Sequence, residues 1–319
     1  MNVLQQLRAW FHPDANPANP ANVAMPIGYA HDLLASLMTM AWFVEARDPY
    51  TGGHLWRVSQ YARLLADTAG MSSAIAARIS LGGFLHDLGK VGVPDAILRK
   101  TDKLTDDEYA VIKTHPSMGA RMLAGHPLAA LVHGAIYQHH ERPDGKGYPL
   151  GLSSDAITDM AAIVGICDAF DAMTSSRPYR KGMPLEKALS IIQAEQGRQF
   201  HIGFAQHFVA LGEAGRLHHI AGHSDEGIPL QHCHHCGPTL AVRREQQPGD
   251  LIYCPSCTGE FRLTRADGCP LPEPTGRMGT AADLEPQLDA ALIARTVTSA
   301  VQALPVAELL QTASAAGIV

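Results

Sequence analysis

The sequence predicts a mostly α-helical protein, built as a helical bundle domain followed by a small β module and a C-terminal helical tail. Aromatic residues make up only 6% of the 319-residue chain, whereas Ala, Leu and Met, which favour helices, are plentiful. Before residue 214, apolar residues recur every three or four positions, as they do on one face of a helix. The hydrophobic content of 46% is ample for a packed core.

Residues 1–27 are rich in Pro, Asn and Ala without periodicity, so we expect a flexible lead-in without a sensor domain. Residues 28–214 are predicted to form one helical domain. Its clearest helix start is the segment Leu104-Thr105-Asp106-Asp107-Glu108, which has the pattern of a capping box. One further helix is expected to begin at Tyr29, and the next to carry Leu55, Val58, Ala62 and Leu65 on one face. Other helices are expected to cover about 72–88, 126–141, 159–174, 184–196 and 202–212.

The composition changes after Leu217, which marks a second module. Residues 215–266 combine His and Cys with short β-prone runs such as TLAVRR, DLIYC and EFRLT. Residues 267–286 are rich in Pro and Gly and are predicted to be a linker. Residues 287–319 are predicted to be a helical tail that packs on the body of the protein or on a second copy, so a homodimer remains open.

The charge balance and the hydropathy restrict the partners and the location. The chain has 25 Lys+Arg against 31 Asp+Glu, a net charge of −6, so no general basic field attracts nucleic acid. An anionic substrate must therefore meet a local group of cations. The N-terminus lacks the pattern of a secretory signal, and no segment reaches the ~20 apolar residues of a membrane span. We therefore expect a cytoplasmic protein without membrane or nucleic-acid partners.

Histidines and aspartates recur along the helical domain, each in or at the end of a predicted helix. The series is His54, His86, Asp87, His115, His139, His140 and Asp168. Helices of one bundle can bring such residues to a shared interior site, although a single histidine is more often capped or solvent-facing. Imidazoles and carboxylates without thiolates suit transition metals. Two ions bridged by Asp87 would generate a hydroxide nucleophile and bind a phosphate, which predicts a phosphodiester hydrolase.

Cations and a glycine-rich loop follow these ligands closely in the sequence. Lys90 lies one turn after His86 and is expected to assist at the phosphate, the alternative being a surface lysine favoured by the helix dipole. The loop RPDGKGYP, residues 142–149, is expected to shape the rim of a nucleotide pocket, or else to be an ordinary tight turn. Arg177 and Arg180 suit a substrate phosphate, or else form a solvated charge cluster.

Four motifs taken together, DPYTGGH, HDLGK, HHERPDGKGYP and CDAFDAMTSSRPYR, resemble the HD-GYP family of cyclic di-GMP phosphodiesterases. They occur in order within residues 30–212. The resemblance implies an HD-type helical bundle that hydrolyses cyclic di-GMP to pGpG and, in many members, on to GMP. It places six residues of the series on metal-ligand positions, and His54 on a further ligand position that some members use.

The same resemblance assigns roles around the metals. Lys90 corresponds to the lysine near the scissile phosphate, and Arg177 and Arg180 correspond to contacts of the substrate phosphates. The GYP triplet is Gly147, Tyr148 and Pro149. All of these positions carry residues competent for the implied chemistry.

Two positions depart from the family pattern. Members with three metals place a glutamate four residues before the equivalent of His54, and this chain has Tyr50 there, which favours a site with two metals. Near the end of the domain, where the family commonly has the triplet FDP, the chain has Phe200-His201-Ile202. This change is expected to affect local packing or the edge of the pocket.

Four of the six cysteines form two CxxC pairs, which predict a zinc-ribbon-like module with one structural zinc. The pairs are Cys233 with Cys236 and Cys254 with Cys257, and 17 residues separate them. A module this small has too little core to fold without such a site. A disulfide or redox chemistry is the alternative, and a neighbouring histidine could replace one ligand. We expect the ribbon to have a structural role or to contact a protein partner.

The sequence thus favours an enzyme over two alternatives. A non-catalytic cyclic-dinucleotide receptor that signals through the zinc ribbon would need neither the complete ligand series nor Lys90. An HD phosphohydrolase acting on another nucleotide is disfavoured by the complete GYP block. Iron or manganese is expected for the two divalent ions, because mixed imidazole and carboxylate sites accept both.

Overall fold

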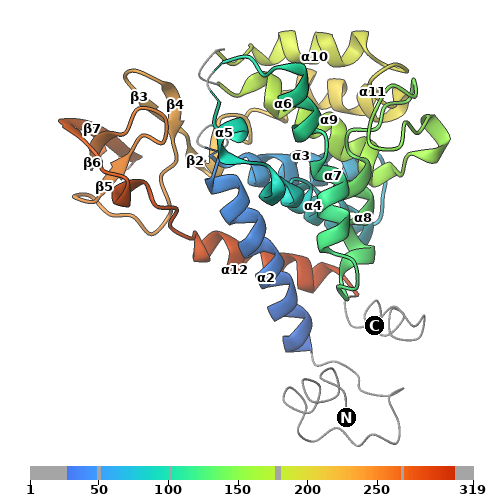
Figure 1. Cartoon of the computed structure of the whole chain (residues 1–319), viewed down its shortest axis with the longest axis horizontal. Helices are drawn as coiled ribbons and strands as arrows, with labels where there is room; N and C mark the ends of the chain where they lie inside the picture. The colour runs from blue at the N-terminus through green and yellow to red at the C-terminus, as the bar shows by residue number, and fades with distance from the viewer. Residues whose placement is uncertain (1–26, 49–51, 101, 177–180, 267–268, 306–319) are drawn as a thin grey trace, which may run out of the picture.

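The computed structural model describes residues 27–48, 52–100, 102–176, 181–266 and 269–305 (Figure 1). Helices dominate up to residue 213, as predicted, and a smaller β region lies to one side of them. The helical part comprises α2 (Ile27–Ala46), α3 (His54–Thr68), α4 (Ser73–Leu85), η1 (Leu88–Gly92), α5 (Asp95–Leu98), α6 (Asp106–Ile112), α7 (His115–Met122), α8 (Ala129–Gln138), η2 (Ser154–Ala156), α9 (Asp159–Thr174), α10 (Leu185–Ala194) and α11 (Ile202–Glu213).

Side-chain caps fix the starts of several helices. The capping box predicted before α6 is confirmed, because Thr105 accepts a hydrogen bond from the Glu108 amide and Glu108 accepts one from the Thr105 amide. Ser72 caps α4 through the amide of Ile75. His201, the departure from FDP, caps α11 by accepting from the amide of Phe204. The substituted residue therefore keeps a function at the helix start.

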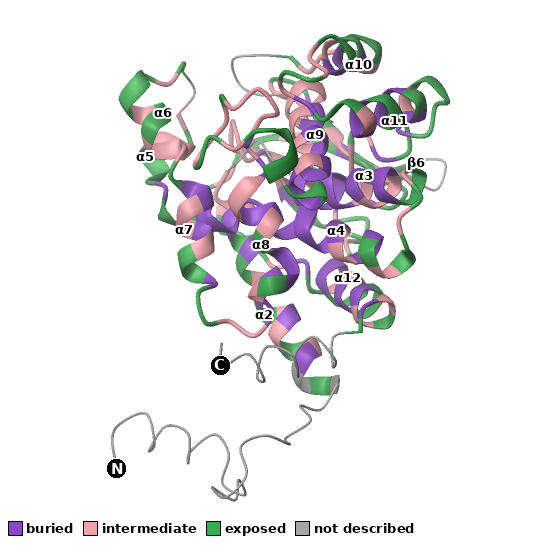
Figure 2. Cartoon of the chain, turned by 90° about the vertical axis from the view of Figure 1, so that its right-hand side faces the viewer, coloured by how far each residue is buried: buried purple, intermediate pink, exposed green. Residues whose placement is uncertain are grey.

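The helices enclose two apolar clusters. In one, α3, α9, α10 and α11 surround the aromatic rings of Tyr61, Phe170 and Phe208, which meet edge to face. The other joins α2, α4 and α8. The buried residues run through the centre of the bundle along α3, α4, α8 and α9 (Figure 2). Of the helices that carry or adjoin the predicted ligands, α3, α4, α8 and α9 thus pack into one or both clusters.

In its described residues, the β region has three small antiparallel sheets. One pairs β1 (His223–Asp225) with β2 (Ile228–Pro229), the next pairs β3 (Gln231–Cys233) with β4 (Gly237–Leu240), and the last has the order β5 (Leu251–Tyr253), β6 (Gly259–Ala266), β7 (Cys269–Met278). Its core contains Leu240, Ile252, Phe261 and Leu263 together with cysteines. So few apolar residues give this region little stability of their own.

The linker predicted over 267–286 is wrong for Cys269–Met278, because this segment is strand β7. Pro270, Pro272 and Pro274 occupy alternate positions of the strand and oppose Arg265, Leu263 and Phe261 of β6. Successive amides of a strand point to opposite sides, so three alternate prolines leave out amides on a single side. An edge strand tolerates that loss on its outer side, and β7 is an edge strand.

The tail forms α12 (Ala290–Ala303), which packs on the body of the same chain. A short turn, η3 (Ala282–Leu284), precedes it. Ile293, Val297 and Ala300 join the cluster of α2, α4 and α8, and α12 crosses α2 in Figure 1. The apolar stripe of the tail is therefore covered within one chain. No helix in the described part of the chain is long and apolar enough to cross a membrane.

Candidate metal centre

The seven residues of the predicted ligand series converge in the interior of the helical bundle. His54 begins α3, His86 and Asp87 follow α4, His115 begins α7, His139 and His140 follow α8, and Asp168 lies within α9. Their ligand atoms form overlapping groups whose members lie within 4.8 Å of one another. The groups are His54, His86 and Asp87; His115, His139 and His140; and His86, His139 and Asp168. The structure thus brings the whole series together.

Asp87 lies between two sets of histidines and presents one carboxylate oxygen to each. Its Oδ2 atom is 3.4 Å from Nε2 of His86 and 3.6 Å from Nε2 of His54. Its Oδ1 atom is 3.4 Å from Nε2 of His115. On the far side, Nε2 of His54 is also 3.6 Å from Oδ1 of Asp168. This arrangement suits a carboxylate that bridges two metal ions.

Main-chain carbonyls orient three of the imidazoles. The Nδ1 atoms of His86, His115 and His139 lie 2.8, 2.8 and 2.7 Å from the carbonyl oxygens of Gly83, Ile112 and Ala135. Such bonds place the proton on Nδ1 and leave the Nε2 lone pair for a ligand. Among the described residues, the buried Nε2 of His86 has no hydrogen-bond partner. An Nε2 acceptor without a partner, close to the carboxylates of Asp87 and Asp168, suits a bound cation.

Burial keeps three of the histidines neutral. It lowers the pKa of His115 to about 4 and that of His140 to about 3, and the neighbouring imidazole of His115 adds to the effect for His140. The pKa of His139 is well below its usual value for the same reasons. Neutral imidazoles are the form that binds metals. This side of the cluster is therefore ready for a divalent ion at neutral pH.

A glycine allows Asp87 to approach His115. A Cβ atom on Gly89 would lie 1.9 Å from the carbonyl oxygen of His115 and 2.5 Å from the amide of Gly119. Only glycine permits η1 and α7 to pack so closely. The motif HDLGK therefore needs its glycine in order to assemble the site.

His54 differs from the other ligands because a carboxylate, Asp171, holds its Nδ1 atom at 2.8 Å. Burial would lower the pKa of His54, but hydrogen bonds to Asp171 and Asp87 raise it to about 10. Metal binding at this imidazole therefore releases a proton. Asp171 in turn forms a buried ion pair with Arg57, with Nε of Arg57 2.5 Å from its Oδ1.

Sequence reasoning missed Asp171 and Arg57. Asp171 follows Asp168 by three residues in α9, and Arg57 follows His54 by three residues in α3, so each pair shares one face of a helix. That spacing was the available signal. It does not by itself distinguish a buried pair from two surface charges.

The side chain of Lys90 reaches the cluster, although α4 ends at Leu85 and does not extend as far as Lys90. The 3₁₀ turn η1 brings its Nζ atom to 2.6 Å from Oδ2 of Asp87. Burial would lower the pKa of Lys90, but Asp87, Asp48 and Asp168 raise it above the usual value. The side chain is therefore an ammonium at neutral pH.

The GYP segment packs tightly against the two adjacent histidine ligands. A Cβ atom on Gly147 would lie 2.4 Å from the amide nitrogen of Arg142 and 2.6 Å from the carbonyl oxygen of His140. The Tyr148 ring stacks on His140 with centroids 4.7 Å apart, and the Tyr148–Pro149 peptide is cis. Glu141, which is buried, accepts from two amides of the loop. The loop thus orients His140.

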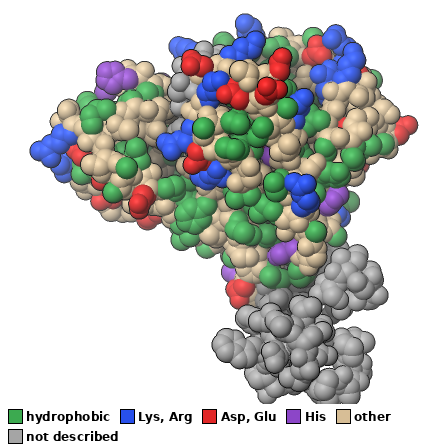
Figure 3. All heavy atoms as spheres, viewed as in Figure 1, with side chains coloured by type: hydrophobic (Ala, Val, Ile, Leu, Met, Phe, Trp, Pro, Cys, Tyr) green, Lys and Arg blue, Asp and Glu red, His purple; other side chains and the backbone are tan. Residues whose placement is uncertain are grey.

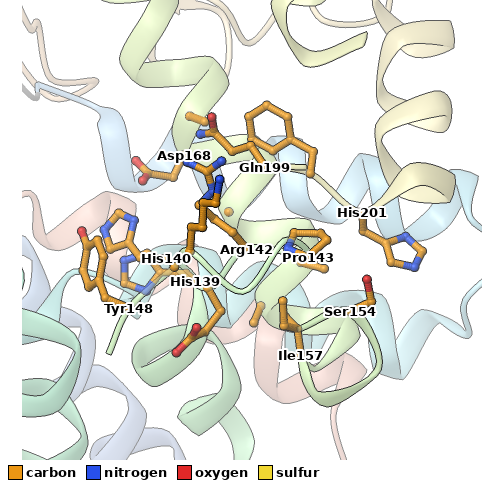
Figure 4. A pocket seen from close by; sticks show the side chains of 18 of the residues that line it. His139, His140, Arg142, Pro143, Tyr148, Ser154, Ile157, Asp168, Gln199 and His201 are labelled. Carbon is orange, nitrogen blue, oxygen red and sulfur yellow. The ribbon is translucent and has the colours of Figure 1, made fainter. Parts of the chain in front are cut away.

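A cavity of about 440 Å³ opens from the metal centre and is lined by His139, His140, Asp168 and the GYP segment. In Figure 4 the ligand histidines and Tyr148 lie at one end, and His201 lies at the other. Lys113, Arg142 and Lys146 also line it. Elsewhere, Lys and Arg are dispersed over the face shown in Figure 3. Arg177, Arg180 and Tyr50 lie outside the described residues.

The four cysteines of the two CxxC pairs form a second cluster in the β region. Their sulfur atoms lie within 4.8 Å of one another, and Sγ of Cys233 is 3.5 Å from Sγ of Cys257. All four are free thiols. Two are buried and two are half-buried, so the cluster suits one tetrahedral ion.

Comparison with known proteins agrees with this geometry. A family model described as "HD domain" matches residues 39–203, more than half of the chain. The chain is 41% identical to the cyclic di-GMP phosphodiesterase response regulator RpfG of Xanthomonas campestris pv. campestris (strain 8004), over 52% of this chain and 44% of that protein. It is 36% identical to a cyclic di-GMP phosphodiesterase of Thermotoga maritima, over 57% of this chain and 50% of that protein.

A third relative has another named substrate. The chain is 37% identical to 3'3'-cGAMP-specific phosphodiesterase 3 of Vibrio cholerae serotype O1, over 54% of this chain and 38% of that protein. The chain spans half or less of the length of all three relatives. The family match covers the helices that carry all seven predicted ligands, and the chain belongs to the HD domain family.

Proposed function

We propose that this chain is a metal-dependent phosphodiesterase that hydrolyses cyclic di-GMP to pGpG, GMP or both. The observation that carries the proposal is Asp87, whose two oxygens face two separate groups of imidazoles. One ion would be held by His54, His86, Asp87 and Asp168, and the other by Asp87, His115, His139 and His140. Divalent ions supply Lewis-acid activation of water and phosphate, and iron or manganese suits this donor set.

The protein's own residues would then position and assist the substrate. Lys90 is an ammonium beside Asp87, so it can neutralise charge that develops on the phosphate or protonate the leaving oxygen. Tyr148 and Gly147 shape the cavity next to His140. Lys113 and Lys146 supply positive charge along the same cavity, as does Arg142, which also pairs with Asp144, and this suits the second phosphate of a cyclic dinucleotide.

The choice of cyclic di-GMP rests on the HD-GYP resemblance and on relatives with that activity in their names. A second candidate is 3'3'-cGAMP, because a relative of 37% identity is named for it. Both substrates have two phosphodiester bonds in one ring, and the cavity chemistry serves either. The bases therefore decide between them.

The test is anaerobic incubation of the iron- or manganese-loaded protein with cyclic di-GMP and, separately, with 3'3'-cGAMP, with products separated by chromatography. Wild type is compared with Asp87→Ala and His139→Ala, and with the control His133→Ala, an exposed histidine of α8. We expect wild type and His133→Ala to form linear products, and the other two variants to form none. Tight nucleotide binding without turnover in the metal-loaded wild type would instead indicate a receptor.

For the β region we propose a zinc-ribbon-like module with one structural zinc on Cys233, Cys236, Cys254 and Cys257. Two observations support this proposal. The four thiols lie close enough to bind one ion, and the core of the module has too few apolar residues to be stable without it. We infer a structural role for this module or contact with a protein partner.

A further inference from the structure

Arg57 connects the metal centre to a strand that lies beyond the HD domain match. Its side chain is buried, with 1% exposed, and donates to partners on three segments. Nε and Nη2 bind the two oxygens of Asp171 at 2.5 and 2.9 Å. Nη1 binds the carbonyl oxygens of Gly52 at 2.8 Å and of His223 at 2.9 Å. His223 belongs to β1, about 20 residues after the end of the family match.

Asp171 transmits this anchorage to a predicted ligand. Its Oδ2 atom accepts from Nη2 of Arg57 and lies 2.8 Å from Nδ1 of His54. The fork of Arg57 fixes the plane of the carboxylate, and the carboxylate fixes the imidazole ring. Nε2 of His54 then faces Asp87 and Asp168, 3.6 Å from each. The direction of the His54 lone pair therefore depends on Arg57.

Strand β1 fits directly against the start of α3. A Cβ atom on Gly53 would lie 2.5 Å from Cα of Ser224 and 3.0 Å from the carbonyl oxygen of His223. No side chain can separate the two backbones at this point. A displacement of β1 would therefore change the environment of Arg57 and of the first turn of α3.

The C-terminal elements hold β1 in place through Asp225. This carboxylate is buried, with 4% exposed, and its Oδ2 atom binds Arg295 of α12 at 2.5 Å and Arg244 at 3.2 Å. Arg244 lies between β4 and β5, so Asp225 ties β1 to both the ribbon and the tail helix. Arg244 also donates to the carbonyl of Glu226 at 2.7 Å.

We propose that β1 is part of the metal centre as a positioning element: it holds Arg57, which orients His54 through Asp171, and Asp225 keeps it in place. Arg57, Asp171 and Asp225 are thus positioning residues for the ion on the His54 side. The inference rests on the proposed function only in requiring that the His/Asp cluster binds divalent ions. Through β1, the ribbon and the tail helix would therefore influence the orientation of His54 in the metal centre.

The experiment titrates the 319-residue chain with manganese in competition with a chelator, so that the affinities of the two ions are measured separately. The variants are Asp225→Ala, which releases β1, and Arg57→Lys, which keeps the charge and loses the fork. Asp283→Ala is the control for the first, because it removes a carboxylate that bonds to Thr280 and Tyr253. Arg63→Lys is the control for the second, because Arg63 is an arginine of α3 paired with Asp67.

We expect both test variants to lower the affinity for one of the two manganese ions roughly 10- to 100-fold and to leave the affinity for the other unchanged. Controls should bind manganese as wild type does, and circular dichroism should show all variants folded at the assay temperature. Unchanged binding in both test variants, or equal weakening of both ions, would overturn the inference. A wild type that binds two ions but cleaves no cyclic dinucleotide would refute the proposed function and leave this inference standing.

Discussion

The Nζ atom of Lys90 lies 2.6 Å from Oδ2 of Asp87, the same oxygen that faces His54 and His86. The Lys90 ammonium thus contacts an Asp87 oxygen that is also proposed to bind one of the two metal ions. Lys90 itself offers a metal no lone pair while it is an ammonium. Its contribution is therefore to the reacting phosphate and not to metal retention.

Replacing Lys90 tests this division of roles. We expect Lys90→Ala to lower kcat for cyclic di-GMP by roughly 10²- to 10³-fold, the usual effect of removing one preorganised donor. Metal content should remain that of wild type, because the imidazoles and carboxylates are intact. Steady-state kinetics and elemental analysis on one preparation check both. Loss of metal, or an unchanged kcat, would contradict the assignment.

The convergence of this series was predictable because each predicted helix contributes one or two of its members and the members join motifs of known order. His86, Asp87, His139 and His140 are adjacent pairs, so a single helix end delivers two ligands. The structure adds direction: carbonyls such as that of Gly83 orient the rings. The sequence could not show which carbonyl groups orient these rings, because every residue has a carbonyl group.

The residues that sequence missed act through contacts between distant segments. Arg57 and Asp171 are 114 positions apart, and no local pattern pairs them. Strand β7 was missed for a different reason, because alternate prolines usually indicate a linker and its edge position appears only when β6 is placed beside it. Local signals such as the Thr105 capping box, by contrast, transferred directly to the structure.

The buried His115 predicts a pH-dependent stability. Its pKa is about 4 in the folded chain because of burial, against a usual value of 6.5. Between these pH values the unfolded chain binds more protons, so the free energy of unfolding decreases as the pH falls. His54, with a pKa of about 10, stays protonated in the folded chain over this range, and its unfolded form completes protonation just below pH 6.5, so it adds only a small slope of opposite sign.

We expect chelator-treated wild type to lose about 1.5 kcal/mol of unfolding free energy through His115 between pH 6.5 and pH 5. The lowered pKa values of His139 and His140 act in the same direction. Urea denaturation at both pH values should give a smaller loss for His115→Gln than for wild type. The control His133→Gln, which changes an exposed histidine, should keep the full loss. An equal loss in wild type and His115→Gln would count against this account.

The cysteine cluster predicts zinc that is independent of the catalytic metals. Purified protein should contain about one zinc per chain that survives Asp87→Ala and is lost in Cys233→Ser. Because a structural zinc contributes folding free energy, the β region of Cys233→Ser should become sensitive to limited proteolysis while the helical domain stays resistant. Zinc content that is unchanged by Cys233→Ser would exclude this site.

Gly147 and Gly145 provide a matched pair for the GYP loop. Gly145 has φ +73°, and the nearest atom to an added Cβ is 3.8 Å away, so Gly145→Ala brings strain without a collision. We expect it to cost about 1–2 kcal/mol of stability. At Gly147 the added Cβ would lie 2.4–2.6 Å from backbone atoms of residues 140–142, so the loop must move.

Movement of that loop displaces Tyr148, which stacks on His140 at 4.7 Å. Gly147→Ala should therefore raise KM for cyclic di-GMP about tenfold or more, since a small misplacement of a positioning group is costly. Gly145→Ala should leave KM close to that of wild type despite its lower stability. Steady-state kinetics and urea denaturation of both variants separate the two effects. Equal KM values in the two variants would mean that backbone strain, and not the position of Tyr148, governs the loop.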